Sequence, residues 1–315
     1  MSSKDGSISN SEIQTFKSCR RRWYLAYYRE LGLQPTAQNS VGARQLGTKV
    51  HVALDRMYAE NANPIEVVNQ LYAADIERWP SAREALQREA DLARAMLEGF
   101  VQWIEETGAD EFIRIVATEQ ALEVPLDAIP GVRLKGKLDQ RVIRELDGAR
   151  LFRDWKTVGD LSTPLRLLPI DEQMKFYHLL EYLDALSKTG DGPPEPTGGA
   201  LYAMLRKVKR TGRANPPFYD QIEVRHNQET LRSMWLRTVR VIHEIMGLRA
   251  ELDSGVDHRY AAYPRPSRDC SWSCDFLPIC PMFDDGSNVE GLIAEHYTHV
   301  DPDARYGTDD KAVDS

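Results

Sequence analysis

The sequence predicts an α/β fold in which a sheet core follows a helical N-terminal region. Three observations support this class. Apolar residues recur at helical spacing through the first third of the chain, the spacing changes to that of strands between Phe112 and Thr157, and helical and strand-like stretches alternate afterwards. With 315 residues, of which 42% are hydrophobic, the chain can bury one large core or two modest ones.

Helices account for the N-terminal region. The first is predicted to begin at Ser9 or Ser11, either of which can act as N-cap, and to end near Gly32. The helical pattern resumes from about residue 42 to 60, and again in stretches from 64 to 108.

Three strands follow, in the stretches FIRIVATEQALEVPL, VRLKGKLDQRVIREL and ARLFRDWKTV. The Pro-Gly and Asp-Gly pairs between them are turn signals, so the strands are predicted to form a meander. A helix is then expected at about 170–187, strands near 199–208 and 219–224, and a long helix at about 227–252. Low complexity is confined to the connector GDGPPEPTGG (190–199) and to an acidic tail.

The net charge of −8 does not exclude a nucleic-acid partner, because it is concentrated in one segment. Residues 284–315 hold nine acidic and two basic residues, or −7, so the rest of the chain is nearly neutral. No stretch approaches the roughly 18 uninterrupted apolar residues of a membrane span. The N-terminal MSSKDGSISN also lacks the apolar region of a secretory signal, so a cytoplasmic protein is expected.

Two basic clusters are candidates for contact with phosphates, although a basic run is more often a solvated face. The first is CRRRW and the second is LRKVKRTGR. Their basic residues are Arg20, Arg21 and Arg22, and Arg206, Lys207, Lys209, Arg210 and Arg213.

Asp154 and Lys156 stand two positions apart in LFRDWKTV (151–158), an apolar run typical of a buried strand. Alternation places both on one face and Trp155 on the other. Burying both charges is costly unless an ion compensates them; the alternative is that Asp154 ends a strand and Lys156 is solvated. Asp139 lies in the preceding strand, across a short hairpin. Because neighbouring carboxylates repel unless a cation separates them, these residues suit Mg²⁺ or Mn²⁺.

The stretches GKLD and RDWK resemble the metal motif of the PD-(D/E)XK nucleases. Further elements resemble the RecB-like branch of that superfamily, which includes the AddB-type and CRISPR-associated iron-sulfur exonucleases. These elements are Gly47-x-x-x-His51 on an early helix, Gln173-x-x-x-Tyr177 on the helix after RDWK, and cysteines at both ends of the chain. The resemblance implies a nuclease core with a central mixed sheet flanked by helices.

The resemblance also implies the metal ligands. Asp139 and Asp154 would bind Mg²⁺ or Mn²⁺, with His51 and the Trp155 carbonyl as further ligands. Apart from the resemblance, His51 would be interpreted as a hydrogen-bonded core histidine. Glu119 lies where related enzymes often have an acidic residue, but a surface carboxylate is an equal alternative.

Three further side chains are assigned catalytic roles by the same resemblance. Lys156 would orient the attacking water or stabilise the developing phosphorane charge. Gln173 and Tyr177 stand at i and i+4, so one helical face carries both beside the active site. Otherwise Tyr177 would be a core residue and Gln173 a solvated one.

The four cysteines form the second signal. Cys19 stands alone near the start, whereas Cys270, Cys274 and Cys280 lie in RDCSWSCDFLPIC. In an intracellular protein, clustered cysteines are more often metal ligands than disulfides, and four thiolates fit Zn²⁺ or a 4Fe-4S cluster equally well by count. Structural zinc sites usually use paired knuckles, whereas the one-plus-three split is that of the iron-sulfur RecB-like nucleases. The resemblance therefore implies a 4Fe-4S cluster.

Together these features predict a metal-dependent DNA exonuclease that acts on single-stranded or frayed ends in recombination, repair or phage DNA metabolism. The alternatives are a non-catalytic subunit that binds DNA ends and a structure-specific endonuclease. No G-x-x-x-x-G-K-[ST] motif occurs, so any unwinding would require a helicase partner. The expected regions are a helical region at 1–110, a nuclease core at 111–255, a cysteine loop at 256–283 and a flexible acidic tail at 284–315, all within one globular unit.

Overall fold

The computed structural model describes residues 6–189 and 197–306. The chain divides into two compact units whose segments alternate along the sequence, instead of following the predicted order of regions. Unit 1 comprises Met1–Gln34, Ala121–Gly136 and Arg232–Ser315, and unit 2 comprises Pro35–Gln120 and Lys137–Leu231. Part of the connector and the end of the acidic tail lie outside the described residues.

A mixed sheet forms the centre of unit 2, as predicted, although residues 121–125 of β3 and 133–136 of β4 are assigned to unit 1. Its strands are β3 (Ile113–Pro125), β4 (Arg133–Arg144), β5 (Ala149–Val158), β6 (Thr197–Arg206) and β7 (Tyr219–Val224). The meander is confirmed in its order, because β3 pairs with β4 and β4 pairs antiparallel with β5. β5 then pairs parallel with β6, and β6 pairs antiparallel with β7. The parallel pair follows from the helical crossover between β5 and β6.

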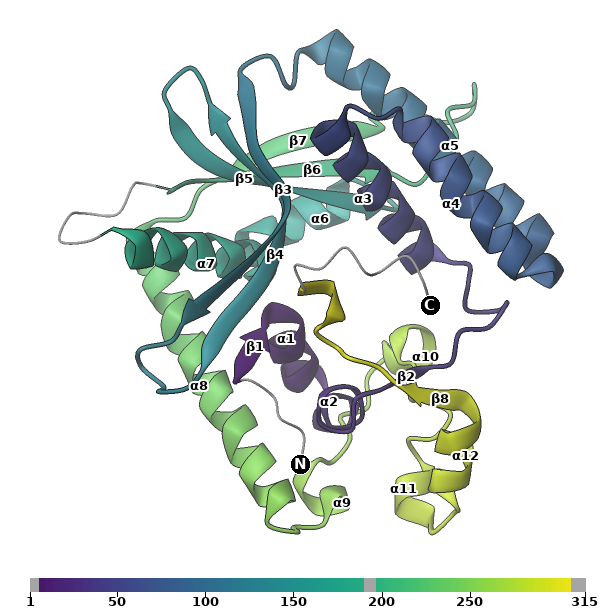
Figure 1. Ribbon diagram of the computed structural model, residues 1–315, viewed down its shortest axis with the longest axis vertical. Coiled ribbons are helices and arrows are strands. Elements are labelled where there is room, and N and C mark those ends of the chain that lie inside the picture. The colour runs from purple at the N-terminus through teal and green to yellow at the C-terminus, as the bar shows by residue number, and fades with distance from the viewer. Residues whose placement is uncertain (1–5, 190–196, 307–315) are drawn as a thin grey trace. The chain divides into compact units, whose positions relative to one another are not determined.

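Helices cover both faces of this sheet. α3 (Ala43–Glu60), α4 (Pro64–Arg78), the 3-10 turn η2 (Pro80–Ala82) and α5 (Arg83–Thr107) lie together in Figure 1. Their buried apolar residues form one core with Trp155 of β5, which is fully buried. The opposite face of β5 carries Phe152, which packs edge-on against Tyr177 of α7 (Glu172–Lys188). α6 (Ser162–Leu167) and the 3-10 turn η3 (Leu168–Ile170) join β5 to α7.

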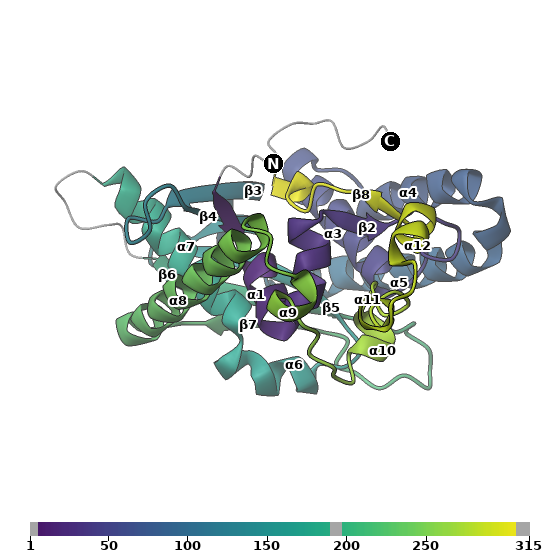
Figure 2. The same cartoon turned by 90° about the horizontal axis from the view of Figure 1, so that it is seen from below.

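Unit 1 contains both ends of the described chain. Its N-terminal elements are β1 (Ser7–Ser9), α1 (Asn10–Ser18), α2 (Arg20–Trp23), the π-helix η1 (Tyr24–Tyr28) and β2 (Leu31–Leu33). β1 pairs parallel with the first residues of β4. Most of the long helix α8 (Gln228–Asp253) also belongs here, beside α1 in Figures 1 and 2. Buried Glu12 holds these helices together, because it accepts hydrogen bonds from the Trp23 indole and the Arg249 guanidinium.

One predicted helix is interrupted in the structure. The helix expected from Ser9 or Ser11 to Gly32 breaks at Cys19, whose backbone is extended (φ −162°, ψ 119°) between α1 and α2. Ser9 does cap α1, since its side chain accepts a hydrogen bond from the Glu12 amide. Cys19 is therefore not part of a helix, and the periodicity of apolar residues does not predict this interruption.

The C-terminal part of unit 1 consists of short elements that extend into the predicted acidic tail. They are α9 (His258–Ala261), α10 (Cys270–Ser273), α11 (Met282–Asp285), α12 (Val289–His296), β8 (Tyr297–His299) and the 3-10 turn η4 (Ala304–Tyr306). β8 pairs antiparallel with β2, and Glu290 binds Arg29 through two hydrogen bonds of 2.7 and 2.9 Å. Residues 284–306 of the predicted tail thus contain regular elements, and part of their negative charge pairs with arginines of the N-terminal elements.

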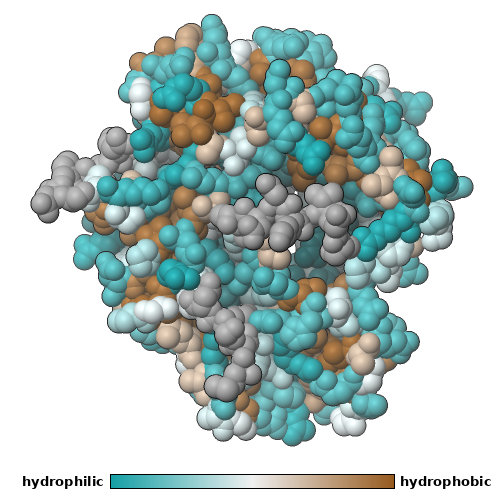
Figure 3. Space-filling view, in the orientation of Figure 1, coloured by the Kyte–Doolittle hydropathy of each residue, from teal (hydrophilic) through white to brown (hydrophobic). Residues whose placement is uncertain are grey.

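None of the helices in residues 6–189 and 197–306 has the length and apolar character needed to cross a membrane. The face of the molecule in Figure 3 is largely hydrophilic, and its hydrophobic residues lie in separate patches.

Candidate active site and cysteine cavity

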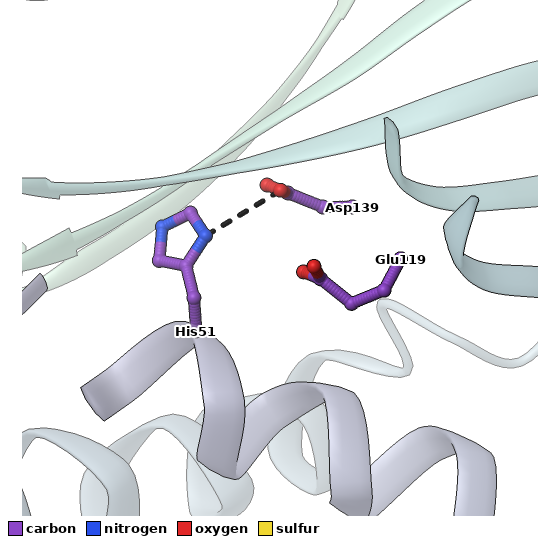
Figure 4. A group of neighbouring side chains, drawn as sticks. All are labelled: His51, Glu119 and Asp139. Atoms are coloured by element: carbon purple, nitrogen blue, oxygen red, sulfur yellow. Dashed lines mark ion pairs between the residues drawn. The ribbon is translucent and has the colours of Figure 1, made fainter. Parts of the chain in front are cut away.

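Three potential metal ligands converge in unit 2. His51 comes from α3, Glu119 from β3 and Asp139 from β4, and one ligand atom of each lies within 4.8 Å of the others (Figure 4). The Nδ1 atom of His51 is 3.4 Å from Oδ1 of Asp139. Within the described chain, no other group of three or more His, Cys, Asp or Glu side chains meets this criterion.

Close packing of α3 against β5 places His51. A Cβ atom on Gly47 would lie 3.1 Å from the Thr157 hydroxyl, so the glycine permits the helix to approach the strand. One turn later, His51 meets the Trp155 ring edge-on, with centroids 6.2 Å apart. Tyr58 stacks on the same tryptophan at 5.6 Å. The element that approaches Gly47 closely is thus strand β5.

The backbone of Glu119 is in an unusual conformation. Its φ is +46°, in the left-handed region that side chains other than glycine rarely adopt, although the residue lies within β3. Its carboxylate is 2.5 Å from the Lys137 ammonium. A left-handed residue within a strand redirects its side chain away from regular alternation. Alternation along β3 therefore cannot reveal that Glu119 faces His51 and Asp139.

Asp139 lies where the β4–β5 ladder ends. The last ladder partners are Gln140 and Arg153, and one further step of this register would place Asp139 opposite Asp154. The Trp155 amide donates its hydrogen to the Asp139 carboxylate at 2.8 Å, where a continued ladder would supply a main-chain carbonyl. Burial raises the pKa of Asp139, but the hydrogen bond and charge of His51, with further help from Lys156 and this amide, bring it below its ordinary value.

Asp154 and Lys156 form a close ion pair beside Asp139. Nζ of Lys156 is 2.7 Å from Oδ2 of Asp154, and the Asp154 side chain is 5% exposed. Burial is the main cause of a raised pKa for Asp154, which Lys156 opposes and Asp139 reinforces. Burial alone would lower the pKa of Lys156, but the carboxylates of Asp154 and Asp139 raise it above its ordinary value. The two carboxylates thus interact, and Asp154 adjoins the three-residue group through Asp139 while it pairs with the lysine.

Two other predicted residues adjoin this pair. Gln173 donates a hydrogen bond of 3.3 Å to the Tyr177 hydroxyl on one face of α7, as the i, i+4 spacing predicts. Tyr177 is also close to Lys156, to whose raised pKa it adds a minor contribution. Tyr202, which sequence reasoning missed, is the β6 partner of Asp154 in the parallel ladder. Tyr202 lies next to Asp154 because β5 pairs with β6, and no local sequence motif predicts that pairing.

The donors fit a divalent cation. Carboxylate oxygens suit Mg²⁺ and Mn²⁺, and an added imidazole nitrogen favours Mn²⁺. Asp55 lies one turn after His51 on α3. Burial is the main cause of a raised pKa for Glu119; Lys137 opposes it, and the carboxylates of Asp139 and Asp55 add to it. Oδ1 of Asp55 is buried and has no hydrogen-bond partner among the described residues. An excess of buried carboxylate oxygens is the condition that a bound cation relieves.

A network behind the site was also missed by sequence reasoning. Asp110 accepts hydrogen bonds from the Tyr58 hydroxyl at 2.7 Å and from the Arg153 guanidinium. Arg153 is 1% exposed and also bonds Gln140 at 3.2 Å. These contacts join α3, β4 and β5, the elements that carry His51, Asp139 and Asp154. Their partners are far apart in sequence, so only the fold brings them together.

The four cysteines share one cavity in unit 1. The cavity has a volume of about 330 Å³, and its lining includes Cys19, Cys270, Cys274 and Cys280. All four thiols are free of disulfides. The break between α1 and α2 brings Cys19 to the loop of the other three. Four thiols around one cavity suit a cluster or metal with sulfur ligands.

The composition of the two basic clusters predicts side chains that are available to phosphates, but several of these side chains are buried or bonded within the protein. Arg21 is 2% exposed and binds Asp284 at 2.7 and 2.9 Å and the Cys280 carbonyl at 3.1 Å, so its guanidinium is not available to phosphates. Arg20 is about one-third exposed beside Glu244, and Arg22 lines the cysteine cavity. In the second cluster, Arg206 and Arg210 bond main-chain carbonyls and Lys209 lies 3.8 Å from Asp91. Lys207 is half-buried and Arg213 is exposed.

The mixed sheet flanked by helices, with candidate metal ligands on its strands, is consistent with a nuclease core. The chain belongs to the PD-(D/E)XK nuclease superfamily, whose family model matches residues 7–281. Members of this superfamily are typically nucleases that act on DNA with divalent metals such as Mg²⁺. No protein of curated function matches the chain in sequence.

Proposed function

We propose that this protein is a metal-dependent DNA exonuclease that hydrolyses phosphodiester bonds at single-stranded or frayed ends. The observation that carries the proposal is the convergence of His51, Glu119 and Asp139 next to the Asp154–Lys156 pair. Its setting would be recombination, repair or phage DNA metabolism, with a helicase or recombinase as partner. Its cofactors would be Mg²⁺ or Mn²⁺ and a 4Fe-4S cluster.

His51, Glu119 and Asp139 would hold the divalent cation, with Asp154 and the Trp155 carbonyl completing the set. A cation held there would lower the pKa of water and offset the charge of the scissile phosphate. The hydrogen bond from the Trp155 amide fixes Asp139, and the Trp155 ring supports His51. Both ligands are therefore oriented before substrate arrives, which reduces the reorganisation required.

Lys156 would act as a charged group and not as a general base. The neighbouring carboxylates raise its pKa, so it remains protonated at neutral pH. A fixed ammonium can stabilise the charge that develops on the phosphoryl oxygens and can orient the attacking water through a hydrogen bond. The Asp154 carboxylate, 2.7 Å away, positions the ammonium for this task. Gln173 and Tyr177 would confine it from α7.

The iron-sulfur assignment rests on the shared cavity and on the one-plus-three distribution of its cysteines. A cluster would join Cys19 to the C-terminal loop and so stabilise unit 1. Anaerobically purified protein should be brown and should contain about four iron atoms per chain if a 4Fe-4S cluster is present. Colourless protein that contains zinc would contradict this part of the proposal without affecting the nuclease part.

The exonuclease assignment follows the resemblance of the motifs to RecB-like exonucleases. The expected DNA contacts are Arg20 and Arg22 in unit 1 and the exposed Lys209 in unit 2. Trp272 is 77% exposed and could stack on a base of a single strand. Arg21 is excluded from this surface because it is buried.

The test compares linear and circular single-stranded DNA. End-labelled linear strands and closed circles are incubated with Mg²⁺ or Mn²⁺ and with the wild-type protein, Asp154→Asn, or the control Asp127→Asn. Asp127 is an exposed carboxylate in the turn after β3. We expect wild-type and Asp127→Asn to digest only the linear strand, and Asp154→Asn to digest neither. Cleavage of the circle would show an endonuclease, and metal-dependent binding without cleavage would show a non-catalytic subunit.

A further inference from the structure

We propose that the segment Pro264–Ser267 is a two-donor clamp that sets the reduction potential of the metal cluster held by the cysteines. The proposal rests on the iron-sulfur cluster of the proposed function and adds to it the residues that act on the sulfur atoms. All four residues of the segment line the cysteine cavity.

Two main-chain amides of the clamp point at cysteine sulfurs. The Arg265 amide donates to Sγ of Cys19 at 3.4 Å, and the Ser267 amide donates to Sγ of Cys270 at 3.4 Å. These cysteines are about 250 positions apart in sequence, so one short segment reaches both the isolated cysteine and the first of the C-terminal group. The Cys270 amide in turn donates to the Ser267 carbonyl at 3.2 Å, which closes a turn around that sulfur.

The sequence of the clamp restricts it to these two donors. Its order is Pro-Arg-Pro-Ser, and proline has no amide hydrogen. Every amide hydrogen in the segment is therefore directed to a cysteine sulfur. Because Arg265 precedes a proline, its backbone is limited to extended or polyproline conformations, which keeps the alternating arrangement stiff.

A side-chain contact fixes the clamp beside Cys19. The Arg265 guanidinium donates to the Lys17 carbonyl at 3.1 Å, two residues before Cys19. The Arg265 backbone and side chain thus bind the same stretch of the N-terminal elements. This geometry separates the two functions of the residue, because the amide acts on sulfur and the guanidinium anchors the segment.

Hydrogen bonds to cluster sulfurs are among the determinants of reduction potential. An amide dipole aimed at a thiolate favours the more negative, reduced state of a cluster, so it raises the potential. Loss of either amide should lower the potential without removing a ligand. The serine hydroxyl, 4.0 Å from Sγ of Cys270, contributes less because of its distance.

The experiment uses the full chain, purified without oxygen, with iron content and visible spectrum recorded first. Arg265→Pro removes the amide hydrogen, and the neighbouring proline already restricts this position to a conformation that proline adopts. Arg265→Ala keeps the amide and removes the guanidinium, so it is the matched control. Potentials are measured by redox titration followed by electron paramagnetic resonance. We expect Arg265→Pro to shift to lower potential and Arg265→Ala to stay near the wild-type value.

A second measurement does not depend on the stability of a variant. In the reduced wild-type protein, amide protons that donate to cluster sulfurs should give hyperfine couplings that disappear in D₂O. Their absence would overturn the clamp, as would an iron-replete Arg265→Pro protein with an unchanged potential. An equal shift in Arg265→Ala would overturn it too, because the anchor and not the amide would then be responsible. A wild-type protein without iron would instead refute the cluster itself, and the clamp with it.

Discussion

The left-handed backbone of Glu119 gives a prediction that separates stability from function. At a regular strand position, glycine is less stable than alanine by roughly 0.5–1 kcal/mol, because glycine loses more conformational freedom on folding. At φ +46° the order should reverse, because a Cβ atom in the left-handed region costs about 1–2 kcal/mol. Glu119→Gly removes this cost, whereas Glu119→Ala keeps it.

The expected magnitudes follow from the contacts of Glu119. Its ion pair with Lys137 has both side chains about 30% exposed, so its loss costs at most about 1 kcal/mol in either variant. Relief of strain by about 1–2 kcal/mol, less the 0.5–1 kcal/mol intrinsic to glycine, should leave Glu119→Gly more stable than Glu119→Ala by roughly 0.5–1 kcal/mol. Relative to the wild type, Glu119→Gly should be nearly neutral.

The assay is urea unfolding followed by tryptophan fluorescence, together with Mn²⁺ titration and digestion of single-stranded DNA. Val116 supplies the control pair, because it is 54% exposed in the same strand and is not among the residues with positive φ. Val116→Gly should be less stable than Val116→Ala. Both Glu119 variants should bind Mn²⁺ more weakly, by at least about 10–100-fold, and should lose activity in parallel.

Two results would contradict the two parts of this reasoning. If Glu119→Gly is less stable than Glu119→Ala by the same margin as at Val116, the left-handed conformation carries no strain. If Glu119→Gly keeps the metal affinity of the wild type, the carboxylate is not a ligand, whatever its effect on stability.

Three further predictions concern burial, pH and packing. Arg21→Met should destabilise the protein by roughly 2–3 kcal/mol, because it breaks three charge-assisted hydrogen bonds of a buried side chain. The control Arg20→Met should cost less than about 1 kcal/mol, because its ion pair is partly exposed. Urea unfolding measures both. Burial, with the adjacent His178, lowers the pKa of His226 to about 4. As the pH falls below about 6.5, this histidine therefore takes up a proton in the unfolded state before it does so in the folded state. The free energy of unfolding should fall between pH 6.5 and 4 by on the order of 1–2 kcal/mol. His226→Asn should flatten this pH dependence; an unchanged slope would contradict it. Gly47→Ala should destabilise the protein by up to about 1–2 kcal/mol, because the added methyl meets the Thr157 hydroxyl at 3.1 Å and this cost exceeds the roughly 1 kcal/mol that alanine gains over glycine in a helix. An unchanged or raised unfolding midpoint would show that this side chain yields freely.

The periodicity of the sequence was sufficient for the order of elements. The spacing of apolar residues predicted β7 at residues 219–224 and α8 at about 227–252, and the structure has them at Tyr219–Val224 and Gln228–Asp253. Local rules succeed here because the burial of one face of a strand or helix is written into consecutive residues. The i, i+4 pair Gln173 and Tyr177 is correct in geometry for the same reason.

The tertiary structure decided which distant residues meet. Asp139 and Asp154 were predicted to lie near each other, and their carboxylates do interact. The β4–β5 ladder ends one step before them, and Asp139 contacts His51 while Asp154 pairs with Lys156. Likewise, composition could not distinguish the buried Arg21 from its half-buried neighbours Arg20 and Arg22, since the partner of Arg21, Asp284, is more than 260 positions away.

The sequence by itself therefore determined the α/β class, the superfamily motifs and the chemical types of the candidate ligands. Only the tertiary structure determined the direction of the Glu119 side chain, the break at Cys19 and the cavity that the four cysteines share. The physical reason is that local sequence fixes which face of an element is buried. Strand register, a single backbone dihedral angle and contacts between distant segments are instead set by the packing of the whole chain.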